Sequence, residues 1–397
     1  MNQELTFKPS SRNQTIALAL VGLGAAVAIY GVIADPKRVW PSLLLNGFYF
    51  ASLALSALFF ISTQRLTGAR WSASLRRIPE AFTTALPYGA VLLALVYFGR
   101  HWIFPWTDPN AFIHEPLRNG KPIAGHVEYL QTSGVFLRVV VSVVLWALFG
   151  WLFRKWSLEQ DQNPRQNMAI HRRLNKLAPV FVIVFALSFT LVSYDLVISL
   201  EPKWTSTMFG LYTFAGLFVC GIAAVTLATL FLRENSPLRD WIGDHQIHDL
   251  GKMLFAFSTF WAYIWTCQFL LIWYGNIPDE VPHFVRRTSG PWLFLFLANL
   301  VINWIVPFFT LLSVKAKCTT KVLKFICVLV LCGHWLDLYM LIMPAQWDAP
   351  KILLELPIAA GYAGLLYFIF TRGLAQAQLV PVNDPILLAE LQVEHAH

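Results

Sequence analysis

Apolar runs of about 20 residues, separated by shorter polar stretches, follow one another along the whole chain. At a rise of about 1.5 Å per residue, a helix of that length crosses the hydrocarbon core of a bilayer. The pattern therefore predicts an all-α polytopic membrane protein with ten transmembrane helices. The expected spans are residues 15–33, 41–61, 81–99, 132–153, 177–200, 206–232, 250–273, 291–313, 322–343 and 353–371.

The fifth and ninth expected spans share a motif in which an aspartate precedes a proline by seven residues. Asp195 stands before Pro202, and Asp337 stands before Pro344. If the second to fifth spans and the sixth to ninth spans form two four-helix bundles, each aspartate lies in the fourth helix of its bundle. Two such bundles enter the membrane in the same sense, which is a known repeat geometry in membrane proteins. Chance recurrence of so short a motif is the alternative.

The composition leaves no room for a large soluble domain. Hydrophobic residues make up 57% of the 397 residues and charged residues only 13%, about half the share that is usual in soluble proteins. We therefore expect one integral membrane domain over residues 1–397. Within it, residues 41–200 and 206–343 are expected to form the two bundles, and residues 372–397 a polar C-terminal tail.

The formal net charge of +8 indicates membrane topology rather than nucleic-acid binding, because the basic residues are unevenly divided between the two sides. The side of the membrane with the two termini and the loops after the even-numbered spans collects 20 of the 30 Lys and Arg residues, the opposite side holds nine, and Arg138 lies inside a span. Loops rich in Lys and Arg remain in the cytoplasm. Both termini are therefore expected to be cytoplasmic. The residues on that side include Arg65, Arg70, Arg76, Arg77, Arg154, Lys155, Arg172, Arg173, Lys315 and Lys317.

Two opposite charges are expected inside the membrane at a similar depth. Asp195 lies seven residues before Pro202 at the outer end of its span, and Arg138 lies six residues after Thr132, where its span enters. Both are thus about 9–10 Å deep at the helical rise per residue. A lone charge at that depth is costly, so the two side chains are expected to pair. The pair either locks two neighbouring helices or belongs to a proton-handling or quinone-headgroup site.

The ninth span carries His334 and Asp337, which are three residues apart and so share one helix face. Asn299 and Asn303 share a face of the neighbouring eighth span. These residues form either a satisfied polar core or a proton relay, because histidine titrates near neutral pH and a carboxylate fixes its tautomer. The full set of candidates for a proton pathway is Asp195, Arg138, His334, Asp337, Tyr194 and Glu201.

The sequence shows no ligand set for a metal or a redox cofactor. The five cysteines form neither a CxxC nor a CxxCH motif, which disfavours zinc, iron–sulfur and c-type haem sites. His334 is the only histidine well inside a span, whereas a transmembrane b-type haem needs two axial ligands. We therefore expect no catalytic residue, no metal and no bound cofactor in this chain, and no residue is assigned to quinone binding.

Four ordered tracts resemble the NrfD/PsrC-like membrane subunits, and among these the ActF subunits of alternative complex III, a respiratory quinol:electron-acceptor oxidoreductase. A further tract, FLRVVVSVVLWALFGWLFRKWSLEQD at 136–161, is also similar to the ActF type. The resemblance covers the fourth to tenth spans, and the first three carry little signature. The four tracts are SYDLVISLEPKWTSTMFGLYTFAG (193–216), FAFSTFWAYIWTCQFLLIWYGNIPDE (255–280), ANLVINWIVPFFTLLS (298–313) and GHWLDLYMLIMP (333–344).

The resemblance implies two four-helix bundles with two peripheral helices, in a complex of the bacterial cytoplasmic (inner) membrane. It implies partner subunits that carry the electrons, namely an extracytoplasmic iron–sulfur subunit and c-type haem subunits. A paralogous NrfD-like subunit, ActC, is implied to hold the main site for quinol or menaquinol, and small membrane subunits and lipids complete the surroundings. Asp195 matches the family's acid in the fifth span, and His334 and Asp337 match its polar pair in the ninth.

We therefore expect a cofactor-free membrane subunit that contributes a proton pathway, a second quinone pocket, or both, to quinol oxidation. A secondary transporter is the main alternative, because internal repeats with buried polar residues are also typical of transporters. Against it, no expected span shows the Gly or Pro interruption that opens the backbone to a substrate at the midplane. A purely structural membrane scaffold is the third interpretation, and the isolated chain is not assigned an enzymatic activity.

Overall fold

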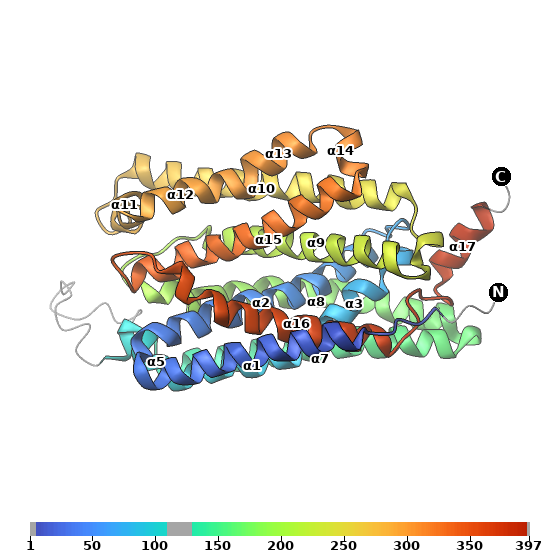
Figure 1. Ribbon diagram of the computed structural model, residues 1–397, viewed down its shortest axis with the longest axis horizontal. Helices are drawn as coiled ribbons and strands as arrows, with labels where there is room; N and C mark the ends of the chain where they lie inside the picture. Colours follow the sequence, from blue (N-terminus) through green and yellow to red (C-terminus); the bar gives the residue numbers. More distant parts are fainter. Residues whose placement is uncertain (1–4, 109–128, 395–397) are drawn as a thin grey trace.

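The computed structural model describes residues 5–108 and 129–394, which fold into helices joined mostly by short turns (Figure 1). Within these residues, ten helices are long and apolar enough to span a membrane. Each coincides with one of the ten expected spans, and most extend a few residues further. The predicted fold class, an all-α polytopic membrane protein, is confirmed.

Most spans are built on one long α-helix, whereas the third and eighth consist of shorter pieces. The long helices are α1 (Ser11–Ala34), α2 (Pro36–Leu66), α7 (Thr132–Gln162), α8 (Asn167–Leu196), α9 (Phe209–Asn235), α10 (Asp244–Gly275), α15 (Thr320–Ile342) and α16 (Leu356–Ala375). The third span contains α3 (Arg77–Thr83), α4 (Leu86–Leu95), η2 (Val96–Gly99) and α5 (Arg100–Ile103). The eighth contains α12 (Trp292–Leu300), η7 (Val301–Ile305) and α13 (Val306–Leu311).

Shorter elements connect or extend the spans. They are η1 (Ala73–Leu75), η3 (Pro105–Thr107), η4 (Pro164–Gln166), η5 (Ile198–Leu200), η6 (Pro237–Asp240), α11 (Val281–Thr288), α14 (Val314–Cys318), η8 (Met343–Ala345), η9 (Ile352–Leu354) and α17 (Pro385–Glu394). Two of these elements lie beside candidate residues. The short helix η5 follows the end of α8, which carries Asp195, and α11 lies between α10 and α12.

Proline, asparagine and glycine mark several helix ends. Pro36 opens α2, where its missing N–H needs no partner. Asn276 ends α10 in the left-handed conformation, with φ of 47°, and its amide donates to the carbonyl oxygen of Ile272. The amide of Gly243, just before α10, donates to Oε1 of Gln246 at 2.7 Å. These residues determine where the helices begin and end, and thereby how far each side chain lies from the end of its helix.

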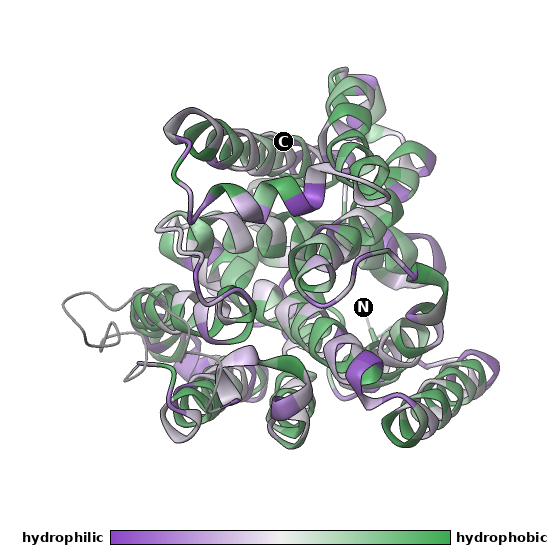
Figure 2. Cartoon of the chain, turned by 90° about the vertical axis from the view of Figure 1, so that its left-hand side faces the viewer, coloured by the Kyte–Doolittle hydropathy of each residue, from purple (hydrophilic) through white to green (hydrophobic). Residues whose placement is uncertain are grey.

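The spans between the first and the last are called here, in chain order, the first and the second group of four, and the remaining two spans are called the outlying pair. The first group comprises α2, α3 with α4, α7 and α8, and the second comprises α9, α10, α12 with α13, and α15. Helix α2 packs on α8, α9 and α15 and is almost wholly buried, so it lies between the groups. The outlying pair is α1 and α16. Figure 2 shows the chain along its helix axes. Apolar residues predominate on the helices, and many of the polar residues lie at the helix ends and in the connecting segments.

Two spans depart from the regular α-helix, which the sequence did not predict. Between α3 and α4, Thr84 and Ala85 form a turn whose amides donate to the carbonyl oxygens of Ala81 and Phe82. Between α12 and α13, the segment η7 is a π-helix. Both departures keep local backbone hydrogen bonds. Neither is therefore the unwound helix that a transporter uses to expose its backbone to a substrate.

Both termini lie at one end of the molecule, called here the terminal end, and α5 and α11 lie at the opposite, distal end (Figure 1). The sequence predicted a polar tail from residue 372, but α16 continues to Ala375 and the chain then folds back on the terminal end. Leu379 and Val380 are fully buried, and the amide of Leu379 donates to the carbonyl oxygen of Leu5 at 2.8 Å. This packing makes the described part of the tail an integral element of the fold.

Candidate proton-handling site

The carboxylate of Asp337 is the centre of a buried polar cluster in the second helix group. Three neutral side chains donate to it: Tyr212 from α9, Trp261 from α10 and Asn299 from α12. The Nδ2 atom of Asn299 lies 2.7 Å from Oδ1, and the indole nitrogen of Trp261 lies 3.1 Å from Oδ2. Asp337 is only 6% exposed, so these donors replace water as the groups that solvate the carboxylate.

Asn303 orients one of these donors. Its Nδ2 atom donates to Oδ1 of Asn299 at 2.7 Å. Because Asn299 accepts with its amide oxygen, its amide nitrogen is left facing Asp337. The shared face of Asn299 and Asn303 was predicted from their spacing, and the structure confirms it. The π-helical turn that contains Asn303 adjoins this contact.

Two glycines let the helices approach closely enough for the cluster to form. A Cβ atom at Gly216 of α9 would lie 3.3 Å from Nδ1 of His334 and 3.5 Å from Oδ2 of Asp337. A Cβ atom at Gly333 of α15 would collide with the side-chain amide of Asn303. Small residues are the usual means of bringing transmembrane helices into close contact.

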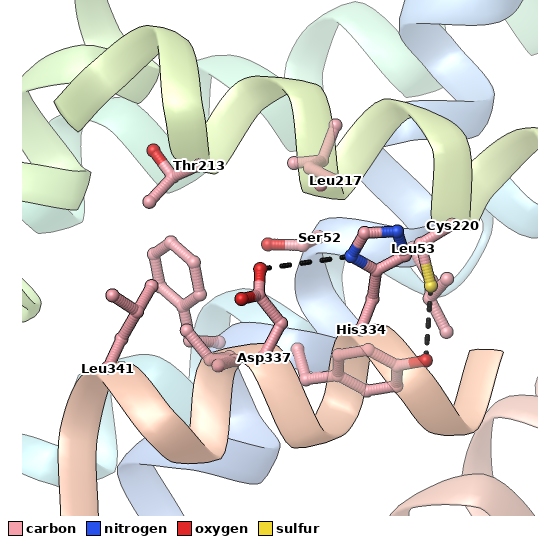
Figure 3. Close-up of a pocket in the computed structure, with 12 residues that line it drawn as sticks. Ser52, Leu53, Thr213, Leu217, Cys220, His334, Asp337 and Leu341 are labelled. Carbon is pink, nitrogen blue, oxygen red and sulfur yellow. Dashed lines mark hydrogen bonds and ion pairs between the residues drawn. The ribbon is translucent and has the colours of Figure 1, made fainter. Parts of the chain in front are cut away.

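His334 lies one turn before Asp337 on α15, and Figure 3 shows both side chains at the edge of one cavity. Its Nδ1 atom is 3.8 Å from Oδ2 of Asp337, within ion-pair range but too far for a hydrogen bond. Neither ring nitrogen has a hydrogen-bond partner among the described residues. The cavity has a volume of about 40 Å³, enough for water. Polar groups on its other walls belong to Tyr49, Ser52, Thr213 and Cys220.

The electrostatic balance of this cluster depends on His334. In the part of the chain that the structure describes, His334 is the one ion-pair partner of Asp337. Three donors stabilise the ionised carboxylate, but its buried charge stays uncompensated while the imidazole is neutral. Uptake of a proton by His334 would neutralise the pair. The ion-pair partner of Asp337 is thus a titratable group and not a permanent cation.

Asp195 has a different partner, the guanidinium group of Arg138. The Nε and Nη2 atoms of Arg138 each lie 2.8 Å from one of the two carboxylate oxygens, which is the bidentate geometry. Arg138 also donates to the carbonyl oxygen of Tyr129 at 3.1 Å and lies over the ring of that tyrosine. The carboxylate is fully buried, whereas the Arg138 side chain is 27% exposed. The predicted pairing of Arg138 with Asp195 is confirmed.

The structure does not bring the two aspartates together. Asp195 stands in the last turn of α8 and Asp337 in α15, and no hydrogen bond or ion pair within residues 5–108 and 129–394 joins their partners. Tyr194, the neighbour of Asp195, contacts neither cluster. Its hydroxyl donates to the carbonyl oxygens of Ser206 at 2.9 Å and Thr207 at 3.2 Å. The six candidates thus occupy separate positions rather than one continuous chain of hydrogen bonds.

Glu201 belongs to a network at the distal end with two residues that the sequence analysis missed. The Nη2 atom of Arg287 lies 2.8 Å from one Glu201 oxygen, and Nδ1 of His283 lies 3.0 Å from the other. Burial alone would raise the pKa of Glu201, but Arg287 and His283 outweigh it and lower that pKa to about 2. Burial, together with the charge of Arg287, lowers the pKa of His283 to about 4. At neutral pH, Glu201 is therefore a fixed negative charge and His283 is neutral.

Arg287 also reaches the helix that carries Asp337. Its Nε atom donates to the carbonyl oxygen of Met340 at 2.8 Å, and its Nη2 atom to that of Leu341 at 2.9 Å. These carbonyl groups lie at the C-terminal end of α15, where helical partners run out. One guanidinium group thus joins the distal ends of α8 and α15. The signal for it in the sequence was the spacing of His283 and Arg287, four residues apart on one face of a short helix.

No three His, Cys, Asp or Glu side chains converge to hold a metal ion in the described ranges. The predicted lack of a bound cofactor stays a prediction. Comparison of the chain with protein-family models finds no match, and comparison with curated proteins finds no relative. The resemblance to NrfD/PsrC-like subunits, with the partners that it implies, therefore rests on the sequence tracts alone.

Proposed function

We propose that this chain is a proton-handling membrane subunit in which His334 and Asp337 bind and release the proton. One observation carries the proposal: the ion-pair partner of this buried carboxylate is a histidine whose two ring nitrogens have no partner among the described residues. A carboxylate that serves only as a structural charge is better matched by a permanent cation, as Asp195 is by Arg138. A titratable partner suits a group whose charge changes during function.

In the proposed cycle, Asp337 stays ionised under its three neutral donors while His334 takes up a proton from water in the adjoining cavity. The protonated imidazole neutralises the carboxylate, and release of the proton restores the buried charge. The cavity of about 40 Å³ admits water but is far smaller than the several hundred Å³ of a typical organic-ligand site. The size of this cavity favours proton transfer over transport of a solute.

The subunit is further proposed to belong to a quinol-oxidising respiratory complex of the alternative complex III type, in the ActF position. The four resembling tracts support this assignment, because each supplies a side chain to the surroundings of Asp337. Tyr212 lies in the tract 193–216, Trp261 in 255–280, Asn299 in 298–313 and His334 in 333–344. Four separately matching tracts thus meet at one buried acid, as a shared functional site would require.

On this assignment the chain lies in the bacterial cytoplasmic membrane with its terminal end in the cytoplasm. An ActC-like paralogue holds the main quinol site, and iron–sulfur and c-type haem subunits carry the electrons. Single cysteines at Arg70 and Asp108, which lie in connections on opposite sides in this topology, test the orientation. An impermeant thiol reagent in the cytoplasm should reach the cysteine at Arg70 alone, and equal labelling of both from one side would contradict the topology.

The proton-handling proposal is tested by Asp337→Asn in the complete complex, reconstituted into sealed vesicles. Asparagine has the size of aspartate but cannot ionise. Quinol should still reduce the haems, since electrons pass through neighbouring chains, whereas proton release per electron should fall. The matched control is Asp240→Asn, an exposed aspartate at the terminal end. Normal proton release and normal turnover in assembled Asp337→Asn and His334→Gln complexes would leave the cluster structural and the chain a scaffold.

A pull-down of the chain from its native membrane tests the wider assignment. Absorbance of c-type haem and iron–sulfur clusters in the purified material supports a respiratory complex. A monodisperse chain that carries no partners would instead favour the secondary transporter. Because these cofactors belong to other subunits, the experiment is independent of every residue proposed for proton handling.

A structural role is the second candidate function, and the geometry at Asp195 favours it there. The bidentate bond from Arg138 places a permanent positive charge on the carboxylate and joins α7 to α8. Such a pair is held ionised by its own geometry. Of the two predicted roles for Asp195, the locking of neighbouring helices is therefore the better supported, and proton handling is proposed for Asp337 and His334 alone.

A further inference from the structure

A buried basic cluster lies at the terminal end of the molecule, away from the proposed proton-handling site. It consists of Arg65 at the end of α2, Arg76 just before α3, and His171 in the first turns of α8. Their exposed fractions are 4%, 3% and 9%, and arginine is rarely so buried unless it is paired. The cluster takes no part in the function proposed above.

Asp384, from the C-terminal segment, is the carboxylate that reaches this cluster. Its Oδ2 atom accepts a hydrogen bond from Nη1 of Arg76, and its Oδ1 atom accepts one from the amide of Ile386 at 2.9 Å. Burial alone would raise the pKa of Asp384, but Arg76 and then Arg65 outweigh it and hold that pKa below its usual range. His171 contributes in the same direction, so all three members of the cluster lie around this one carboxylate.

Arg65 and Arg76 act on the same carboxylate, that of Asp384. Arg77, which also lies near Arg65, already bonds to the carboxylates of Glu80 and Asp161. Asp384 therefore faces two guanidinium groups, those of Arg65 and Arg76, with a single negative charge. Glu80 also acts on Arg65, so the three arginines and the three carboxylates of this region are equal in formal charge, and the cluster lacks hydrogen-bond acceptors rather than net charge.

The cluster is short of hydrogen-bond acceptors. Both oxygens of Asp384 are already engaged, and guanidinium nitrogens are permanent donors. A buried charged donor without an acceptor is destabilising. The buried nitrogens with no hydrogen-bond partner among the described residues are Nε and Nη1 of Arg65, Nε and Nη2 of Arg76, and Nδ1 of His171.

We propose that Arg65, Arg76 and His171 form a second binding site, which takes a phosphate group. A phosphate presents several acceptor oxygens around a tetrahedral centre, enough for the unpartnered donors on three side chains. A second carboxylate would offer only two oxygens in one plane. Basic pockets between transmembrane helices bind lipid phosphates in this way. The group comes either from the headgroup of a phospholipid at this membrane surface or from free orthophosphate.

Asp384 is the internal competitor of that phosphate. Its segment is held at the terminal end by the bond from Leu379 to Leu5 and by Nδ2 of Asn383, which donates to the carbonyl oxygen of Asp161 at 2.6 Å. Because like charges repel, the carboxylate weakens phosphate binding as long as it is ionised. Asp384→Asn should therefore bind phosphate more tightly than the wild type, which a purely structural cluster would not do.

Thermal unfolding of the purified protein in detergent tests the site, with orthophosphate compared against chloride at equal ionic strength. Phosphate should raise the melting temperature of the wild type, and that of Asp384→Asn by more. Arg65→Gln should weaken phosphate binding by roughly tenfold to a hundredfold, because it removes charged donors. The matched control is Arg70→Gln, an exposed arginine close to the end of α2, which should respond like the wild type.

Native mass spectrometry of the wild type distinguishes the two sources of phosphate. A retained phospholipid that is lost in Arg65→Gln but kept in Arg70→Gln identifies a lipid site. A phosphate-dependent melting shift without a retained lipid identifies a site for the free anion. The proposal is overturned if the wild type shows neither a retained lipid nor a phosphate-specific shift, or if Arg65→Gln shows the same shift. These wild-type measurements decide the matter even where Asp384→Asn fails to fold.

Discussion

Asp195 and Asp337 stand near the distal ends of the fourth helices of their two groups, yet their surroundings differ in kind. Asp195 is held by a guanidinium group that bonds to both of its oxygens. Asp337 is held by three neutral donors, and its ion-pair partner among the described residues is an imidazole. Two acids of similar burial thus differ in whether the charge next to them is permanent.

The difference shows how the partner, rather than burial, decides what a buried acid can do. Both carboxylates are buried from bulk solvent, so each depends chiefly on protein groups for compensation of its charge. A permanent cation fixes the ionised form and with it the packing of two helices. A titratable partner leaves the charge of the pair free to change with each proton. Substitutions that remove or exchange the partner of each acid therefore test this difference.

The largest effect is expected at the permanent pair. Arg138→Leu leaves a fully buried carboxylate without its cation, which should lower the free energy of unfolding by about 3–5 kcal/mol. Replacement of both Arg138 and Asp195 by leucine removes the unmatched charge and should recover much of that loss. The melting temperature and the assembled fraction in detergent measure both effects. Single effects that simply add in the double variant would show that the two residues are not coupled.

The second experiment gives Asp337 a permanent cation. His334→Lys should make this site resemble that of Asp195, because an ammonium group near the carboxylate keeps its charge at neutral pH. The complex should still assemble and reduce its haems, but proton release per electron should fall as far as in Asp337→Asn. Unchanged proton release in an assembled His334→Lys complex would show that the imidazole is not the titrating group.

A third acid, Glu201, combines both kinds of partner and should respond to pH in two steps. The pKa of His283 is lowered from 6.5 to about 4, so the unfolded chain binds a proton that the folded chain does not. Stability is therefore complete above pH 6.5 and falls as the pH drops from 6.5 toward 4. The pKa of Glu201 is lowered from 4.5 to about 2, which adds a further loss between pH 4.5 and 2.

Each step is worth up to about 3 kcal/mol, and a melting curve recorded at each pH separates them. His283→Gln should remove the upper step and leave the lower one. Glu201→Gln should remove the lower step and, because it deprives Arg287 of its partner, should also lower stability at pH 7. If His283→Gln loses as much stability between pH 6.5 and 4 as the wild type, that loss belongs to another group.

The smallest effect is expected at Tyr194, which adjoins Asp195 but whose hydroxyl, within the described residues, donates to the loop carbonyl groups of Ser206 and Thr207. Tyr194→Phe removes the hydroxyl that donates to Ser206 and Thr207, at a cost of about 1 kcal/mol. Proton release should be unaffected, since this hydroxyl contacts neither aspartate. A fall in proton release without a fall in assembly would place Tyr194 in the pathway after all.

Much of the architecture and one complete ion pair could be predicted from the sequence. The bilayer demands about 20 apolar residues per helix, so the ten spans are visible as a one-dimensional pattern. Arg138 and Asp195 could be paired because neighbouring antiparallel helices place them at one depth. Both inferences need only distances along a helix. They do not depend on how side chains pack.

The surroundings of Asp337 could not be predicted in the same way. Tyr212 and Trp261 are two aromatic residues in a chain with 31 Phe, 16 Trp and 12 Tyr, so nothing in their spacing marks them as donors. Their role follows from the close helix approach at Gly216, which is a property of three-dimensional packing. The bond from Arg287 to Glu201 was missed for a related reason, because hydrophobic periodicity does not position a short helix between spans.

The outlying pair of helices has a consequence for biosynthesis. Helix α1 leaves the ribosome well before α16, with eight described spans between them, yet Gly24 and Gly361 meet so closely that a Cβ atom on either would touch the other's backbone. Chains fold from the N-terminus during synthesis, so α1 must wait in the membrane while eight further spans are inserted. The packing of α1 on α16 is thus deferred until α16 has been made, and a chain cut short before Leu356 would leave α1 without its principal neighbour.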